Sequence, residues 1–413
     1  MNLKLFHRIM DHMHEKDWNI TQLAKNSNIH LTEISRILNH KQSLSLRNLD
    51  AITEGLNLEE GTFYSDYIEE CFNENKYMDK RRSMEFLYKC ASLGYEDLLQ
   101  NMFNRVLDER SKQILKKNLH YIFLVAERLF EEKKELLALP LYECVIESMP
   151  DYHSSQLAKS IYRKYFIVRL TEQGLDTEVH LLRHLHNLPR EMQLSTYLWI
   201  MATCYIRQDW QKVMDYAKIL EKLAKEGEYY GRALLYQGFA LLRLGGSLEE
   251  VLCIIDRYSK VNDYYSDLAV GNRFVAYLEF GHFEHVDAYL NWLEDRDDML
   301  VGLPRILEVY IKLGRLNDVE ILLNRNFHLF EEMALSKEPF KQQIYLQFRY
   351  SHALYQCTRN KITEGIHEIL DVAITAIELG IAKGYKKCLL MYWNYRHKID
   401  SEHERKYLKI LDR

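Results

Sequence analysis

Apolar residues recur at helical spacing along most of the chain, and the pattern is most informative between Ile20 and His40. Leu23 and Ala24 supply the apolar face of one short helix, and the polar run 26–28 (Asn-Ser-Asn) then interrupts the pattern. A second apolar run follows at the i, i+3, i+4 spacing of an amphipathic helix, with Ile34, Ile37 and Leu38. We predict two short helices joined by a tight turn, with Asn28 in the left-handed conformation that Asn tolerates.

The exposed face of the second predicted helix carries short hydrogen-bonding side chains and cations. Such groups suit the base edges and the phosphates of a DNA major groove. The candidate DNA-binding residues are His30, Thr32, Glu33, Ser35, Arg36 and Lys41.

This stretch resembles the helix-turn-helix of the phage repressor (Cro-like) class at Leu23, Ala24, Ile29, Ile34, Ser35, Ile37 and Leu38. The resemblance implies that the second helix enters the major groove. Residues 46–64 are similar to the next two helices of such domains, with Leu49, Ile52 and Leu56 beneath the reading helix. Two positions depart from the class: His40 stands where a Gly often ends the reading helix, and Leu44 stands near a frequent Pro.

Charge leaves a second interpretation of this domain open. Residues 1 to 64 hold seven Lys or Arg against eight Asp or Glu, so the domain is not basic overall. Between residues 20 and 48, however, Lys25, Arg36, Lys41 and Arg47 outnumber the single acid Glu33, and a local positive face is what phosphate contact needs. The alternative is a helical protein-interaction module.

The rest of the chain repeats one pattern: an apolar helix, a short polar break, a bulky apolar residue and another helix. The breaks are Leu93-Gly94-Tyr95, Lys134-Glu135-Leu136, Gln173-Gly174-Leu175, Gln208-Asp209-Trp210, Gly246-Ser247-Leu248, Gly281-His282-Phe283, Gly314-Arg315-Leu316 and Asn360-Lys361-Ile362. The bulky residues are 41, 39, 35, 38, 35, 33 and 46 positions apart. Recurrence near 34 is typical of tetratricopeptide-type helical hairpins, whose stacking yields a right-handed solenoid with a concave channel.

These patterns predict an all-α fold in four parts. Residues 1–66 form the helix-turn-helix domain, with Leu5, Ile9 and Met13 on one face of its first helix and Trp18 and Ile20 closing the core. Residues 67–80 form a helical connector, 81–385 the repeats, and 386–413 a helix that caps the solenoid or joins two subunits.

Composition agrees with a helical protein of the cytoplasm. Only five Pro and sixteen Gly interrupt 413 residues, of which 47% are hydrophobic and 28% charged. The net charge of -5 confines any nucleic-acid site to a local surface, and no apolar run is long enough to span a membrane. The seven dispersed cysteines suggest reduced core residues, since no C-x-x-C occurs.

Catalytic and metal motifs are not found. The segment HLLRHLH places His180 and His184 four residues apart, with His186 nearby, but a solvated helix face explains them better than a metal site. The sequence contains no H-E-x-x-H, G-x-S-x-G, Walker A or dinucleotide fingerprint. We therefore expect neither an enzyme nor a cofactor.

Tyrosine is abundant, with 29 residues, and many lie on helices expected to face the channel. About half should be core residues with a hydroxyl reaching water. The others, with neighbouring Asn, Gln and Arg, would suit an extended peptide, because an amide both donates and accepts and Arg pairs with a carboxylate. The candidate peptide-binding residues are Arg232, Tyr236, Gln237, Asn272, Arg273 and Tyr277.

This layout resembles the intracellular peptide-pheromone receptors of Gram-positive bacteria and their phages. RRSMEFLYKCASLGYEDLLQNMF after the DNA domain and LPRILEVYIKLGRLNDVEILL further on look most like the arbitrium receptors that govern phage lysis and lysogeny. The resemblance implies a homodimeric transcription regulator that binds an operator and a short oligopeptide. Two alternatives stay open: a repeat scaffold for protein partners, and a Rap-like regulator that acts on response-regulator proteins without binding DNA.

Overall fold

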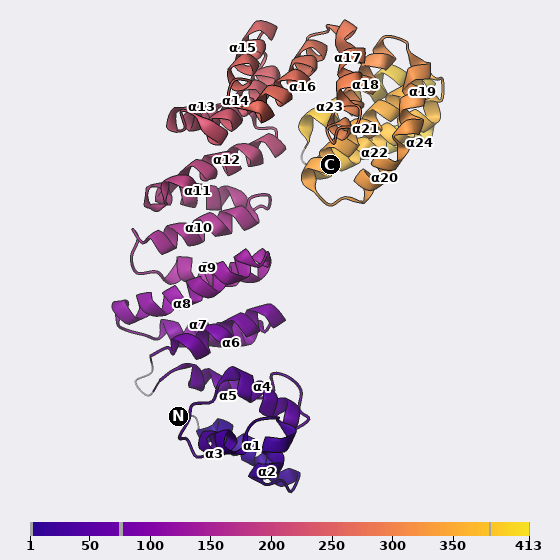
Figure 1. Cartoon of the computed structure of the whole chain (residues 1–413). Helices are drawn as coiled ribbons and strands as arrows, with labels where there is room; N and C mark the ends of the chain where they lie inside the picture. Colours follow the sequence, from indigo (N-terminus) through magenta and orange to yellow (C-terminus); the bar gives the residue numbers. More distant parts are fainter. Residues whose placement is uncertain (1–2, 74–76, 380, 413) are drawn as a thin grey trace. The chain divides into compact units, whose positions relative to one another are not determined.

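A computed structural model describes residues 3–73, 77–379 and 381–412, with the side chains of residues 382 and 383 left aside (Figure 1). Within these ranges the chain is helical apart from turns and one isolated β-bridge, so the all-α prediction is confirmed. The chain divides into two compact units, Met1–Gln193 and Leu194–Arg413. This division falls among the repeats, and the helix-turn-helix domain shares its unit with the first of them.

The first unit begins with the helix-turn-helix domain and continues into helical hairpins. Its elements are α1 (Leu3–Glu15), α2 (Ile20–Asn26), α3 (Leu31–Leu38), α4 (Leu46–Gly55), α5 (Tyr64–Tyr67), the 3-10 helix η1 (Ile68–Cys71), α6 (Lys80–Leu93), α7 (Glu96–Leu107), α8 (Lys112–Glu131), α9 (Glu135–Ser148), α10 (Ser155–Val168), α11 (Gly174–His184) and η2 (Leu185–Asn187). Helix α12 (Arg190–Ile206) spans the boundary between the units.

The second unit consists of further hairpins. Its elements are α13 (Trp210–Leu223), α14 (Gly227–Leu244), α15 (Leu248–Tyr258), α16 (Asp263–Glu279), η3 (Phe283–His285), α17 (Val286–Leu293), α18 (Met299–Lys312), α19 (Leu316–Arg325), α20 (Phe327–Leu335), α21 (Pro339–Thr358), α22 (Ile362–Glu378), α23 (Ala382–Tyr395), η4 (Arg396–Lys398) and α24 (Ser401–Leu411).

The segment predicted as a helical connector, residues 67–80, is not one helix in its described part. Helix η1 ends at Cys71, Phe72 forms a bridge with Met78, and α6 begins at Lys80. The Asn73 side chain accepts a hydrogen bond from the Tyr77 backbone N–H at 2.9 Å, and Asp79 caps α6. Asn and Asp side chains compete with helical hydrogen bonds in this way, which explains the break.

All eight predicted breaks lie at or next to the point where one helix ends and the next begins. In seven of them the chain reverses through one residue with positive φ: Gly94, Lys133, Gln208, Gly245, Gly281, Gly314 and Asn360. The next backbone N–H then reaches back to a carbonyl of the previous helix, as His282 does to Tyr277 at 2.9 Å. This Schellman-type closure satisfies a terminal carbonyl and ends the helix sharply.

Contacts between neighbouring hairpins repeat the same period. Arg163 donates to Glu127 at 3.0 Å, and Arg243 donates to Glu279 at 3.1 Å; each pair is 36 residues apart. Consecutive helices also pack in chain order within each unit, as stacked hairpins require. The repeats are thus seen in side-chain contacts as well as in sequence, and the handedness of their stacking stays a prediction.

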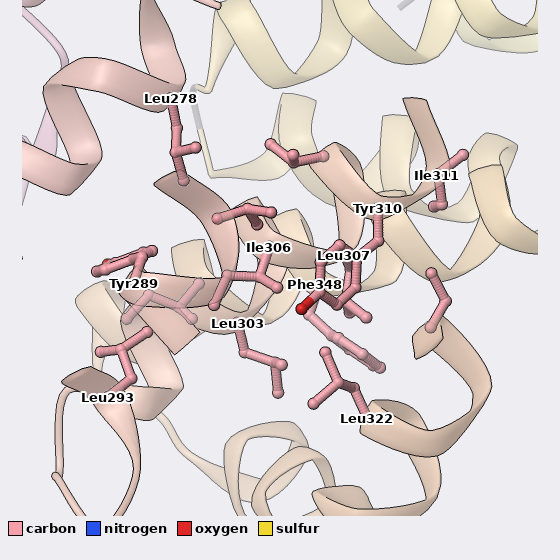
Figure 2. Close-up of a cluster of buried hydrophobic side chains, with 14 of the residues drawn as sticks. Leu278, Tyr289, Leu293, Leu303, Ile306, Leu307, Tyr310, Ile311, Leu322 and Phe348 are labelled. Atoms are coloured by element: carbon pink, nitrogen blue, oxygen red, sulfur yellow. The ribbon is translucent and has the colours of Figure 1, made fainter. Parts of the chain in front are cut away.

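One hairpin in the second unit carries an extra helix. Helix α20 follows α19 and packs on α21, and α21 also packs on α18. Figure 2 shows the resulting core, in which Leu303, Leu307 and Phe348 meet side chains of α17 and α19. The insertion of α20 explains why the last interval between repeats, 46 residues, is the longest.

Candidate DNA-binding surface

The turn between α2 and α3 has the predicted geometry. Asn28 has φ 54°, which confirms the left-handed conformation expected from sequence. The Ile29 backbone N–H donates to the Ala24 carbonyl at 3.1 Å and closes the end of α2. His30 then caps α3, because its Nδ1 atom accepts from the Thr32 backbone N–H at 3.3 Å.

Helix α3 has one buried face and one open face. Ile34 and Ile37 are fully buried, as is Leu49 of α4. His30, Thr32, Arg36 and Lys41 are exposed, while Glu33 and Ser35 are half-buried. The candidate DNA-binding residues therefore lie on or beside the solvent face of α3, the arrangement that groove reading requires.

The Glu33 side chain is bonded within the domain, which the sequence did not indicate. Its Oε1 atom accepts hydrogen bonds from Asn48 Nδ2 at 2.9 Å and from Gln42 Nε2 at 3.2 Å. These bonds hold α3 to the loop after it and to the start of α4. Glu33 thus acts as a positioning residue for the reading helix, with its carboxylate engaged inside the domain.

The two departures from the repressor pattern are accommodated by local contacts. His40 takes the left-handed conformation itself, with φ 58°, and its ring packs edge-on against Phe6 with centroids 4.5 Å apart. Leu44 is fully buried, and its carbonyl accepts from the Tyr67 hydroxyl at 3.1 Å. The loop after α3 is therefore fixed without the Gly and the Pro.

The expected domain core is present except at its edge. Leu5, Ile9 and Met13 are buried, as predicted, whereas Trp18 and Ile20 are only half-buried. Across α1 and α5, Lys4 and Arg8 both pair with the buried Asp66. Burial alone would raise the pKa of the Asp66 carboxyl, but the two cations outweigh it and hold the pKa below its ordinary value.

The helix-turn-helix domain is packed firmly on the first hairpin. Phe86 of α6 is fully buried between Tyr64 and Tyr67, with ring centroids 5.6 and 5.5 Å away. The Tyr64 hydroxyl donates to Asp50 of α4 at 2.7 Å, and Ser83 of α6 donates to the Cys71 carbonyl at 2.7 Å. Sequence reasoning missed this joint, although the aromatic residues at 64, 67 and 86 were a signal for it.

The candidate peptide-binding residues lie on α14 and α16, and most of their polar atoms are engaged within the repeats. The contacts are Arg232 to Glu228 at 2.8 Å, Gln237 to Glu221 at 2.6 Å, Asn272 to Tyr258 at 2.9 Å and Arg273 to Asp256 at 2.6 Å. Tyr236 packs with Tyr205 and Phe239, and Tyr277 stacks on His285. A peptide would have to displace several of these contacts.

A pocket of the second unit lies elsewhere and includes none of those six residues. Its cavity volume is about 50 Å³, and it is lined by Gln208, Glu308, Gln343, Leu346, Gln347, Tyr350, Val372, Ala376, Ile381, Gly384, Lys387 and Cys388. Lys387 pairs with Glu308 at 3.2 Å and lies over the Tyr350 ring. Burial raises the pKa of Tyr350 to about 12, so its hydroxyl stays a neutral hydrogen-bonding group.

The histidines of HLLRHLH do not form a fully solvated helix face. His186 is exposed and His180 half-buried, but His184 is fully buried. The expectation of a solvated face is therefore wrong for His184, because the loop before α10 covers it with the Tyr152 ring, whose centroid is 4.2 Å away.

Comparison with known families supports the identification of the first domain. Residues 8–67 match the family described as the Cro/C1-type HTH DNA-binding domain. The match ends before the repeats begin, and no curated protein matches the chain. Among the described residues, no helix has both the length and the apolar character needed to cross a membrane. The chain thus carries a DNA-binding domain of transcription regulators, followed by helical repeats.

Proposed function

We propose that this protein is a peptide-responsive transcription regulator that acts inside the cell as a homodimer, of the kind found among intracellular pheromone and arbitrium receptors. The observation that carries the proposal is the joint between α4, α5 and α6. The hydrogen bond between Glu33 and Asn48 holds the reading helix α3 to α4. The Phe86 ring, packed against Tyr64 and Tyr67, fixes this domain to the first hairpin. A ligand that shifts the repeats could therefore shift the two reading helices of a dimer, whose spacing decides operator binding.

Direct reading by α3 is tested by Arg36→Ala. Arg36 is exposed, and a bidentate contact from Arg to guanine contributes about 1–3 kcal/mol of discrimination, or roughly 5- to 150-fold in affinity. We expect gel shifts on the DNA upstream of the protein's own gene to show a loss in this range, with the dimer mass unchanged.

Arg81→Ala is the matched control, because Arg81 is exposed on α6 outside the family match and pairs only with Glu85 among the described contacts. It should leave the gel shift unchanged. Equal DNA affinity of Arg36→Ala and the unaltered protein would show that α3 does not read the operator. A protein that shifts no DNA would favour the scaffold and Rap-like alternatives.

The pocket of the second unit is lined by side chains that could bind one end of a short peptide. Its lining is largely apolar, while Lys387 can pair with a terminal carboxylate and Glu308 with a terminal ammonium. Gln343 is already engaged, since its Nε2 atom donates to the Ile206 carbonyl at 2.6 Å. Polar side chains are engaged with one another at both places, so the apolar lining is what favours the pocket over the α14 and α16 surface.

Lys387→Ala tests the pocket directly. A hydrogen bond to a charged group is worth about 1.5–3 kcal/mol, so losing the cation should weaken peptide binding by roughly 10- to 150-fold. The peptide can be identified by mass spectrometry of material carried through purification and then titrated against both proteins. Lys361→Ala, at an exposed lysine outside the pocket, should bind as the unaltered protein does. An unchanged affinity of Lys387→Ala would exclude this pocket.

A further inference from the structure

The pocket of the second unit is too small to enclose a peptide. Its cavity volume is about 50 Å³, whereas pockets that bury a whole small molecule usually measure about 300–1,000 Å³. One water molecule needs about 10–15 Å³ of such space, so the pocket has room for roughly three to five atoms of that size. This matches the side chain of valine, leucine or isoleucine, which has three or four carbon atoms, and excludes an aromatic ring.

The inner wall of the pocket is apolar. Helix α21 contributes Leu346, helix α22 contributes Val372 and Ala376, and Ile381 and Cys388 complete the wall. All five side chains are buried. Burial raises the pKa of the Cys388 thiol to about 12, so the thiol stays neutral and behaves as a small hydrophobe. The wall therefore favours a hydrocarbon side chain over a polar one.

Gly384 leaves the pocket open on the side of α23. A Cβ atom on this residue would lie 3.2 Å from Ile381 Cγ2 and 3.8 Å from Ala376 Cβ, and both atoms belong to the apolar wall. Gly is less favourable than Ala in a helix, but here the missing methyl group leaves space in the pocket. An added methyl group would take up space that a ligand side chain needs.

A second, outer hollow adjoins the pocket at Tyr350 and Lys387, which line both. Its volume is about 420 Å³, which lies within the usual range for a bound ligand. The rest of its lining is Leu354, Leu390, Met391, Asn394 and Tyr395. The Asn394 amide can both donate to and accept from a peptide backbone. A ligand can therefore place one side chain in the pocket and its other residues in the outer hollow.

Lys387 lies where the two spaces meet and can accept a carboxylate there. Its ammonium donates to the two Glu308 oxygens at 3.3 and 3.2 Å, which leaves one of its three N–H donors. The Lys387 side chain is 44% exposed, so an incoming carboxylate can reach it. Glu308 is only 21% exposed and already accepts from Lys387, so a second cation has less access to it. The meeting point thus favours the carboxyl end of a peptide over its amino end.

We propose that the peptide recognised by this protein ends in valine, leucine or isoleucine. The side chain of this last residue fills the pocket, its carboxylate binds Lys387, and the preceding residues lie in the outer hollow. The inference rests on the proposed function for the presence of a peptide, but its test needs neither that peptide nor DNA.

N-acetyl-L-leucine is the probe, because it carries the side chain, the carboxylate and the amide nitrogen of a last residue. Titration of the full-length protein followed by saturation-transfer NMR should show binding of this compound and of its valine and isoleucine analogues. N-acetyl-L-phenylalanine should bind at least about tenfold more weakly, since its ring exceeds the pocket. L-Leucinamide has the ammonium of a first residue and no carboxylate, and it should also bind at least about tenfold more weakly.

Gly384→Ala should weaken the binding of N-acetyl-L-leucine by about tenfold or more, while the unfolding temperature stays unchanged or rises slightly. Gly238→Ala is the matched control, because it makes the same change in α14 of the same unit at a residue that does not line the pocket. It should bind the probe as the unaltered protein does. If Gly384→Ala lowers the unfolding temperature, Lys387→Ala decides the result through its loss of probe binding.

Three outcomes would overturn the inference: no binding of any aliphatic probe, stronger binding of L-leucinamide or N-acetyl-L-phenylalanine, or unchanged binding by a stably folded Gly384→Ala protein. The proposed function would survive these outcomes if operator binding still responds to the purified peptide. Aliphatic probes that bind as expected to a protein that shifts no DNA would support this site and contradict the proposed function.

Discussion

Gly55→Val is expected to destabilise the helix-turn-helix domain by roughly 3 kcal/mol or more and to abolish operator binding at growth temperature. A Cβ atom on Gly55 would lie 2.7 Å from the Ser27 backbone N and 2.9 Å from the Asn26 carbonyl carbon. Both atoms belong to the backbone that ends α2, so a side-chain rotation cannot relieve the clash. The turn between α2 and α3 would have to move, and the reading helix with it.

Gly238→Ala is the comparison for this substitution. Gly238 also lies inside a helix, α14, but a Cβ atom there would meet only Ile254 Cγ2 at an ordinary 3.6 Å. It should leave thermal unfolding and gel shifts almost unchanged. Normal unfolding and normal DNA affinity in Gly55→Val would show that α2, α3 and α4 pack less closely than the structure indicates.

Local sequence was sufficient to predict the helix-turn-helix domain because its determinants are near one another in the chain. The left-handed turn at Asn28 and the buried face of Ile34 and Ile37 depend on residues within one or two helical turns. The same holds for seven of the eight repeat breaks, since each of these closes on a carbonyl five residues earlier, as Arg315 does on Tyr310.

Features that depend on distant partners could not be predicted in this way. The engagement of Glu33 requires Asn48, 15 residues on, and that of Gln237 requires Glu221, 16 residues earlier on another helix. Helical periodicity indicates which face is buried but not which polar groups meet across it. The candidate DNA-binding residues lie on or beside the exposed face of α3, and their contact with DNA stays a prediction, while most of the candidate peptide-binding residues are engaged with neighbours.

In the predicted connector, local hydrogen bonds rather than distant partners made the prediction fail. Residues 67–80 have a polar composition compatible with a helix, yet the Asn73 side chain accepts from the Tyr77 backbone N–H and Asp79 caps the start of α6, so no single helix runs through them. The reading domain and the repeats are therefore joined by packing of α6 against α5 rather than by a continuous helix.

Phe86→Ala is expected to destabilise the first unit by about 3–5 kcal/mol, the usual loss for a buried Phe truncated to Ala. Its ring fills the space between Tyr64 and Tyr67, so the loss falls on the joint itself. Hydrogen exchange should accelerate in α4, α5 and η1, since the domain could then open without the repeats. Under the proposed function, operator binding should persist at low temperature but should no longer respond to peptide.

Phe123→Ala distinguishes loss of coupling from general loss of stability. Phe123 is buried in α8 of the same unit, where its ring packs against Tyr142 of α9. It should lower the unfolding temperature comparably while leaving exchange in α4 and α5 as in the unaltered protein. If both substitutions accelerate hydrogen exchange in the reading domain equally, the first unit unfolds as one cooperative body. An effect of the repeats on the reading helix would then act through the overall stability of the unit and not through the aromatic joint. If only Phe86→Ala does so, the packing of Phe86 against Tyr64 and Tyr67 is what holds the reading domain on the repeats, as the proposed regulation requires.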